Sequence, residues 1–232
     1  MGSLILLSGG QDSATCLAEA CSEYDSVHTI SFDYGQRHHR ELECSKTLSN
    51  LAGVTSHTEL KVSSLQLLGG SALIGDEGAI NQSHPMNESV PASFVPGRNY
   101  IFLGLAAAKA YQLGIDHLIT GVCQTDFSGY ADCRDNSIKA IQVALSNCLS
   151  KDIYIHTPLM WKTKAETVLL MKNLGKLDWY QHTHTCYEGM YPPCRKCPAC
   201  LLRAKGFREA GIEDPIFTKQ PYTEELYQNG LG

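Results

Sequence analysis

A loop rich in serine and glycine follows the first apolar run of the chain, which ends at Leu7. The loop residues are Ser8, Gly9, Gly10, Gln11, Asp12 and Ser13. A glycine loop between a strand and a helix aims free backbone amides at an anion, and the hydroxyl groups add further donors. Asp12 suits either the first helical turn or a magnesium ligand. The loop therefore predicts a phosphate site.

Two better-known nucleotide motifs are absent from this loop. It lacks the Lys-Ser/Thr ending of a Walker loop, so transfer of a γ-phosphoryl group is not indicated, and it lacks the Gly-x-Gly-x-x-Gly fingerprint of dinucleotide sites. A serine-glycine turn before an ordinary helix remains the alternative, because glycine turns after strands are common.

Four of the ten cysteines fall within fifteen residues: Cys186, Cys194, Cys197 and Cys200. Two overlapping Cys-x2-Cys units bring three thiolates together, and the fourth completes a tetrahedron, as in a structural zinc site. An iron–sulfur cluster is the competing interpretation, but its sequence run continues to a further cysteine where Ala204 stands here. We interpret His182 and His184 as loop residues near this site.

Further candidate side chains follow other apolar runs. Asp33 comes at the end of the second run, where the carboxyl ends of parallel strands line a ligand crevice. Arg98 starts a helix and suits a carboxylate or phosphate, whereas Lys164 is either a phosphate contact or a helix-surface residue. The loop 126–134 concentrates hydrogen-bonding groups; Asp126 or Asp132 can accept two adjacent N–H groups of a purine-like base. Cys133 in this loop is a weaker candidate for a nucleophile.

Apolar runs and helical patterns alternate along the chain and supply the elements that position these residues. Strands are predicted at 4–7, 27–32, 54–62, 115–122 and 153–155, and helices at 13–23, 40–51, 99–113, 135–149 and 163–174, with a long loop at 63–97. The last helix opens with a capping box from Thr163 to Glu166. Five strands that are each followed by a helix predict an α/β fold with a doubly wound parallel sheet.

Composition limits the classes of protein. The 232 residues are 43% hydrophobic and 19% charged, which excludes a disordered chain, and the net charge of −5 argues against nucleic acid and anionic membranes as partners. Apolar runs fall short of the ~18 residues that span a bilayer. We expect a cytoplasmic protein with small-molecule partners. A domain at 1–174 and a small metal-binding carboxy-terminal module at 175–232, packed on it, are predicted.

The loop sequence SGGQDS resembles that of the pyrophosphate-loop ATPases. In that group the loop holds the β,γ-pyrophosphate of ATP, and attack on the α-phosphorus gives an adenylate. With Gln11 in the loop, the chain resembles the 7-cyano-7-deazaguanine synthases of the queuosine pathway. The stretches 32–38, 94–99, 126–134, 157–159 and the cysteine cluster carry the same resemblance over nearly the whole chain. One departure is Ala131, where the family pattern often has proline.

The resemblance implies a five-stranded sheet of the adenine-nucleotide α-hydrolase type, a zinc-bearing carboxy-terminal module, and ATP, Mg²⁺ and Zn²⁺ as cofactors. It implies an ATP-dependent carbon–nitrogen ligase that turns 7-carboxy-7-deazaguanine and ammonia into a nitrile through an adenylated acid and an adenylated amide. A homodimer is a further expectation. The implied catalytic residues are Asp12, Ser13, Arg98 and Lys164. The implied ATP contacts are Leu7, Ser8, Gly9, Gly10, Gln11, Asp12, Ser13, Phe32 and Asp33. The implied substrate contacts are Asp126, Tyr130, Asp132 and Arg134.

Two other functions remain open from the sequence. One is a tRNA-modifying adenylating enzyme with a pyrophosphate loop, against which the acidic balance counts. The other is a zinc-stabilised nucleotide-binding adaptor without turnover. The sequence does not decide between AMP plus pyrophosphate and ADP plus phosphate as products, although the loop type favours the former.

Overall fold

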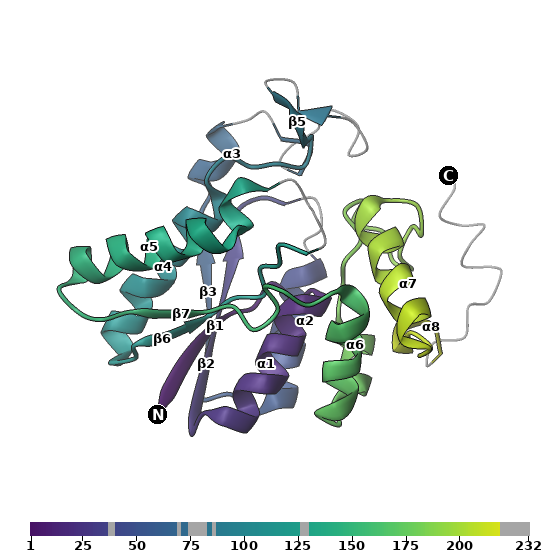
Figure 1. Ribbon diagram of the computed structural model, residues 1–232, viewed down its shortest axis with the longest axis horizontal. Helices are drawn as coiled ribbons and strands as arrows, with labels where there is room; N and C mark the ends of the chain where they lie inside the picture. Colours follow the sequence, from purple (N-terminus) through teal and green to yellow (C-terminus); the bar gives the residue numbers. More distant parts are fainter. Residues whose placement is uncertain (37–39, 69–70, 74–82, 85–86, 126–129, 219–232) are drawn as a thin grey trace.

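A five-stranded parallel sheet forms the centre of the computed structural model (Figure 1), which describes residues 1–36, 40–68, 71–73, 83–84, 87–125 and 130–218. The order of its strands is β3-β2-β1-β6-β7. The strands are β1 (Gly2–Leu6), β2 (Ser26–Asp33), β3 (Ser56–Lys61), β6 (His117–Ile119) and β7 (Tyr154–His156). The predicted doubly wound parallel sheet is confirmed.

Helices cover both faces of this sheet (Figure 1), with α1, α2 and α6 on one face and α4 and α5 on the other. The helices are α1 (Gln11–Glu23), α2 (Arg40–Ala52), α3 (Ser64–Leu68), α4 (Arg98–Leu113), α5 (Asp135–Leu149), α6 (Lys164–Asn173), α7 (Pro198–Ala210) and α8 (Pro215–Thr218), with short 3₁₀ turns η1 (Ala131–Cys133) and η2 (Leu177–His182). The five long helices predicted from the sequence are thus present within two residues of their expected ends.

Strand β1 shows how the sheet divides the core. Successive side chains of a strand point to opposite faces, so Leu4 packs into the cluster that contains Ala106 and Ala110 of α4, whereas Ile5 packs into the cluster that contains Leu17 of α1. From β1 the chain first adds β2 and β3 on one side of the sheet and later adds β6 and β7 on the other, so the order of the strands reverses between β1 and β6. A ligand crevice is expected at the carboxyl ends of the strands at such a point.

The segment 63–97, expected to be a loop, contains more regular structure than the sequence indicated. Its described part includes α3 and an antiparallel pair of short strands, β4 (Ser83–His84) and β5 (Asn87–Pro91). The capping box of α6 is confirmed, because the Thr163 hydroxyl accepts from the Glu166 amide at 3.2 Å and the Glu166 carboxylate accepts from the Thr163 amide at 2.7 Å.

The carboxy-terminal segment shares the core of the sheet domain. Trp179, Tyr180 and Phe207 belong to the same buried cluster as Leu17. The hydroxyl of Tyr180 also lies 2.6 Å from the hydroxyl of Thr15 in α1. The domain boundary between residues 174 and 175 stays a prediction. None of the described helices combines the length and apolar character needed to cross a membrane.

Candidate active site

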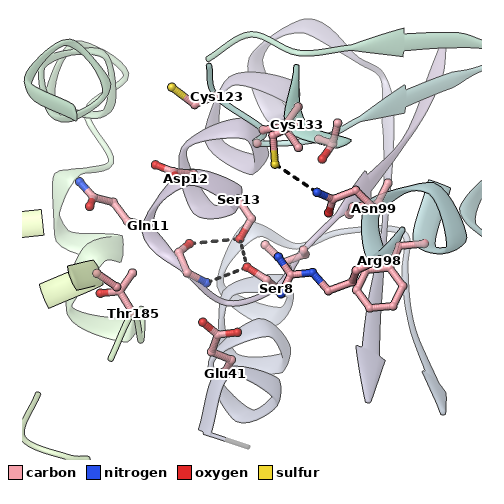
Figure 2. A pocket seen from close by; sticks show the side chains of 18 of the residues that line it. Ser8, Gln11, Asp12, Ser13, Glu41, Arg98, Asn99, Cys123, Cys133 and Thr185 are labelled. Carbon is pink, nitrogen blue, oxygen red and sulfur yellow. Dashed lines mark hydrogen bonds between the residues drawn. The ribbon is translucent and has the colours of Figure 1, made fainter. Parts of the chain in front are cut away.

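A cavity of about 320 Å³ opens at the carboxyl ends of β1, β2 and β6, and the start of α1 forms its floor. Its lining also includes residues from α4, α6 and α7. Figure 2 shows Ser8 and Ser13 in the middle of this cavity, between Arg98 on one side and Gln11 on the other. The cavity thus occupies the crevice that the strand order predicts.

The predicted phosphate loop forms the amino-terminal end of α1. Gly10 is the N-cap of α1 and no side chain caps it, so the amides of the first helical turn have no partner within the helix. The hydroxyls of Ser8 and Ser13 lie 3.1 Å apart, and the Gly10 amide donates to Ser8 at 3.2 Å. Hydroxyl and amide donors therefore meet at one point, as an anion site requires.

Gly9 lies where the loop passes the first turn of α2. Its φ of +91° is in the left-handed region, and an ideal Cβ there would lie 2.1 Å from the carbonyl oxygen of Glu41. Any side chain at this position would collide with α2. A glycine at this position therefore lets the phosphate loop lie against α2.

Asp12 and Lys164 form an ion pair at the edge of the loop. The Lys164 ammonium donates to Oδ2 of Asp12 at 2.6 Å, although the two residues are 152 positions apart in sequence. Lys164 is the first residue of α6, so the capping box before it fixes where its side chain starts. Oδ1 of Asp12 is buried and has no hydrogen-bond partner among the described residues. This oxygen can take a cation or a ligand donor.

An aromatic wall closes another side of the cavity. The rings of Phe32 and Phe102 stack, with centroids 4.2 Å apart and planes inclined by 7°. Tyr34 packs beside Phe102 at 5.4 Å. Flat apolar surfaces of this kind suit a planar heterocyclic base.

Arg98 projects from the first position of α4 toward the aromatic side chains of the cavity. Its Nη1 donates to the Tyr34 hydroxyl at 3.3 Å, and its guanidinium lies 5.9 Å from the ring of Tyr130. The Tyr130 hydroxyl in turn lies 2.6 Å from that of Ser93. A guanidinium held among aromatic rings offers paired donors to a carboxylate or phosphate.

Asp132 and Cys133 hold the start of α4 rather than standing free. Oδ2 of Asp132 accepts from the Asn99 amide at 3.0 Å, and the Asn99 side chain donates to the Cys133 sulfur at 3.1 Å. Burial and the neighbouring charge of Asp132 raise the pKa of Cys133 to about 12. The thiol is therefore neutral near pH 7, which makes it a poor nucleophile.

The predicted site residues divide according to where the structure places them. Those that line the cavity are Leu7, Ser8, Gly10, Gln11, Asp12, Ser13, Phe32, Arg98, Tyr130 and Lys164. Gly9, Asp33, Asp132 and Arg134 do not line it, and Asp126 lies outside the described residues. Asp33 accepts from the Gly35 amide at 3.2 Å in a turn, and Arg134 is an exposed residue before α5. The assignment of roles to these residues stays a prediction.

Several lining residues were not found from the sequence. Phe102 is one, and Thr185, Ala199, Leu202 and Arg203 from the carboxy-terminal segment are others. Phe102 carried a usable signal, because it lies one helical turn after Arg98. The carboxy-terminal residues carried none, since only the docking of α7 brings them to the cavity.

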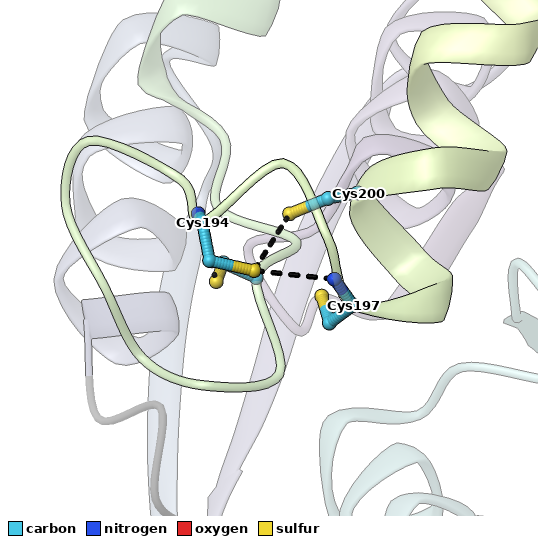
Figure 3. Close-up of side chains that lie close together, drawn as sticks. Cys194, Cys197 and Cys200 are labelled. Carbon is cyan, nitrogen blue, oxygen red and sulfur yellow. Dashed lines mark hydrogen bonds between the residues drawn. The ribbon is translucent and has the colours of Figure 1, made fainter. Parts of the chain in front are cut away.

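The four predicted cysteines converge beside this cavity. Their sulfur atoms all lie within 4.8 Å of one another, and all four residues are buried. Figure 3 shows Cys194, Cys197 and Cys200 turned toward one another. The amides of Lys196 and Cys197 point at the Cys194 sulfur, at 3.5 and 3.3 Å. Hydrogen bonds from Cys186 and Cys200 lower the pKa of Cys197. Four buried sulfurs with amide donors fit a metal with tetrahedral thiolate ligands.

Two solved structures share the fold at low sequence identity. NMN synthetase from Francisella tularensis has a TM-score of 0.53 and 13% identity, covering 98% of this chain and 81% of that one. A 4-thiouridine synthetase–RNA complex with bound ATP has a TM-score of 0.50 and 16% identity, covering 98% of this chain and 50% of that one. The likeness shows that the chain shares its overall α/β fold with these two proteins.

Comparison of the sequence with those of known proteins identifies more similar relatives of this chain. A family model described as "Queuosine biosynthesis protein QueC" matches residues 2–211. The 7-cyano-7-deazaguanine synthase of Laribacter hongkongensis is 46% identical over 93% of this chain and 94% of that protein. The enzyme of the same name from Chromobacterium violaceum is 48% identical over 92% of both chains. Because both the family match and these relatives span nearly its whole length, the chain belongs to the QueC family of queuosine biosynthesis proteins.

Proposed function

We propose that the chain converts 7-carboxy-7-deazaguanine and ammonia into 7-cyano-7-deazaguanine at the expense of ATP. Its membership of the QueC family and the names of its two relatives support this reaction. The structural observation that carries the proposal is the composition of the cavity, where a phosphate loop, an aromatic wall and Arg98 face the same space. Such a cavity can hold a nucleotide and a planar carboxylic acid together.

The chemistry follows from the weakness of a carboxylate as an electrophile. In the first step the substrate carboxylate attacks the α-phosphorus of ATP, which forms an acyl adenylate and releases pyrophosphate. Ammonia then attacks the carbonyl carbon and displaces AMP, which gives the amide. The amide oxygen then attacks the α-phosphorus of a second ATP and displaces pyrophosphate. Loss of AMP from this adenylated amide, together with the protons on its nitrogen, leaves the nitrile. Each AMP thus leaves with one oxygen of the original carboxylate.

Each side of the cavity contributes differently to these steps. The first-turn amides of α1 and the hydroxyls of Ser8 and Ser13 bind the phosphates, and Lys164 balances the charge that develops on the leaving pyrophosphate. The stacked pair of Phe32 and Phe102 offers an apolar surface to the adenine. Arg98 and Tyr130 bind the deazaguanine acid. Bound together, the two reactants react as if within one molecule.

Two metal ions fit the described residues. The free Oδ1 of Asp12 would hold Mg²⁺ beside the phosphates, where the ion neutralises oxygen charge. The sulfurs of Cys186, Cys194, Cys197 and Cys200 would hold Zn²⁺ as a structural ion, because four thiolates leave no open position for substrate.

An oxygen-transfer experiment tests the reaction. The protein is incubated with ATP, Mg²⁺, ammonium and 7-carboxy-7-deazaguanine whose carboxylate carries a heavy oxygen isotope, and the products are weighed by mass spectrometry. We expect the nitrile, together with AMP that contains the heavy oxygen. Label in inorganic phosphate, with ADP as the other product, would contradict attack at the α-phosphorus. Hydrolysis of ATP without the acid would contradict the assignment of substrate.

We further propose that the protein acts in the cytoplasm as a homodimer on small molecules, without a nucleic acid. The acidic net charge of −5 supports the last point. Light scattering on the purified protein measures the oligomeric state. A titration with tRNA at low salt tests for nucleic-acid binding, which would show as a strong dependence of affinity on salt concentration.

A further inference from the structure

Arg203 in α7 lines the cavity but has no donor left for a ligand. Its guanidinium forms two bonds with Asp214, from Nε at 2.6 Å and from Nη2 at 2.8 Å. Nη1 donates to the hydroxyls of Thr183 and Thr185 at 2.7 and 3.5 Å, and Nη2 donates to the Tyr180 carbonyl at 3.2 Å. These bonds use all five N–H groups of an arginine. Any effect of Arg203 on a bound phosphate must therefore be indirect.

The segment that Arg203 holds is bonded directly to the phosphate loop. The His184 amide, next to Thr183, donates to the Gly9 carbonyl at 3.0 Å. In a planar trans peptide the carbonyl and the following N–H point in opposite directions. Fixing the Gly9 carbonyl therefore fixes the direction of the Gly10 N–H, which points to the Ser8 hydroxyl inside the loop.

Helix α7 is itself fixed at several points around Arg203. Cys197 is its N-cap and Cys200 lies in its first turn, so the cysteine cluster holds its start. Gly206, one turn after Arg203, packs against α6 so closely that an ideal Cβ there would lie 2.6 Å from Cβ of Lys164. These contacts fix the position of α7 and therefore the position of Arg203.

We propose that Arg203 and Asp214 are positioning residues that shape the phosphate loop for the β- and γ-phosphates of ATP. They act through Thr183 and the hydrogen bond from the His184 amide to the Gly9 carbonyl, without touching the nucleotide. This proposal rests on the proposed function insofar as ATP is the ligand of the loop. It predicts that breaking the link weakens binding of ATP far more than binding of AMP, which lacks the β- and γ-phosphates.

The test compares ATP and AMP affinities by isothermal titration calorimetry. Removing Arg203 alone would leave the Asp214 charge buried and unpaired, which strongly destabilises a folded protein. The test variant is therefore Arg203→Met combined with Asp214→Asn, because asparagine still offers an acceptor to the Ile216 amide that Asp214 now binds at 3.1 Å. Arg208→Met, an exposed arginine on the same helix, is the matched control.

We expect the double variant to bind ATP roughly tenfold more weakly or worse, as loss of bonds to a charged group implies, with AMP affinity within about twofold. The control should match the wild type for both nucleotides. Equal weakening of ATP and AMP, or no change in either, would overturn the proposal.

A milder variant covers the case in which the double variant does not fold. Thr183→Val removes one hydroxyl partner of Arg203 and keeps the volume of the side chain, and it should still weaken ATP selectively; unchanged ATP affinity would overturn the link. If the wild type binds no ATP, the proposed function fails. If the wild type binds ATP and the variants bind it equally well, only the link fails.

Discussion

At the scale of single residues, two lysine–aspartate pairs of equal length allow the proposed role of Lys164 to be compared with that of a surface pair. Lys164 and Asp12 meet at 2.6 Å in the cavity, and Lys139 and Asp135 meet at 2.6 Å on the exposed side of α5. We expect Lys164→Ala to lower the rate of AMP formation roughly a hundredfold, because it removes a preorganised charge beside the leaving group. Lys139→Ala should leave the rate unchanged, since exposed pairs contribute little.

Initial rates of AMP release at saturating ATP measure both variants, and thermal unfolding confirms that each is folded. Similar rates for Lys164→Ala and Lys139→Ala would show that Lys164 does not contribute to the reaction.

Asp132 allows a second prediction at this scale, because its carboxylate already has a partner within the protein and does not line the cavity. Its carboxylate accepts from the Asn99 amide and so helps to fix the start of α4, where Arg98 is the first residue. Asp132→Asn keeps an acceptor and should retain activity within about threefold, whereas Asp132→Ala should cost roughly 1 kcal/mol of stability as a lost cap. Steady-state kinetics with the carboxy-deazaguanine distinguish the roles.

A residue that reads the base would give the opposite pattern for the asparagine variant. An asparagine presents donors where the base requires an acceptor, so Asp132→Asn would then be nearly as harmful as Asp132→Ala. A large rise in KM for the deazaguanine in both variants would return Asp132 to the substrate site.

At the scale of elements, the position of Lys164 depends on how closely α7 approaches α6, and two helical glycines test this. A Cβ at Gly206 would lie 2.6 Å from Lys164, whereas a Cβ at Gly104 in α4 would have no neighbour within 4 Å. We expect Gly206→Ala to destabilise the protein by about 1–3 kcal/mol and to reduce activity. Gly104→Ala should stabilise it by about 0.5–1 kcal/mol.

Urea unfolding of both variants measures the two changes in the free energy of unfolding. Unchanged stability and activity in Gly206→Ala would contradict the close packing of α7 on α6, and destabilisation by Gly104→Ala would contradict the open space beside α4.

Local elements were predictable from the sequence because their signals are local. The phosphate loop is a strand, two glycines and a helix start in consecutive positions, and the box from Thr163 to Glu166 spans a single helical turn. Long-range contacts were not predictable in the same way. Nothing in the sequence pairs Asp132 with Asn99 or places Arg203 beside Thr183, because these contacts arise only once separate helices have docked.

At the scale of the whole molecule, we expect the cysteine cluster and the sheet to unfold as one unit. Tyr180 and Phe207 of the carboxy-terminal segment pack in the same cluster as Leu17 of α1. We expect removal of the metal by a chelator to lower the melting temperature of the entire chain by roughly 10 °C or more in a single transition, because binding of a structural metal contributes to folding.

Differential scanning calorimetry measures this transition, and elemental analysis identifies the metal. Cys197→Ser should reproduce the effect of the chelator, whereas Cys148→Ser, which changes an exposed cysteine of α5, should leave the melting temperature unchanged. Two separate transitions after metal removal would show that the segment after residue 174 unfolds independently. Iron in place of zinc would contradict the assignment of the metal.

The bond between the His184 amide and the Gly9 carbonyl joins one of the first loops that the ribosome makes to one that it makes much later. While the chain is being synthesised, the phosphate loop emerges early, but Lys164, His184 and Arg203 have not yet been added. Domains fold as their residues become available during synthesis. The loop therefore acquires its final shape only near the end of translation, so the phosphate site of a nascent chain stays incomplete until Lys164, His184 and Arg203 have been added.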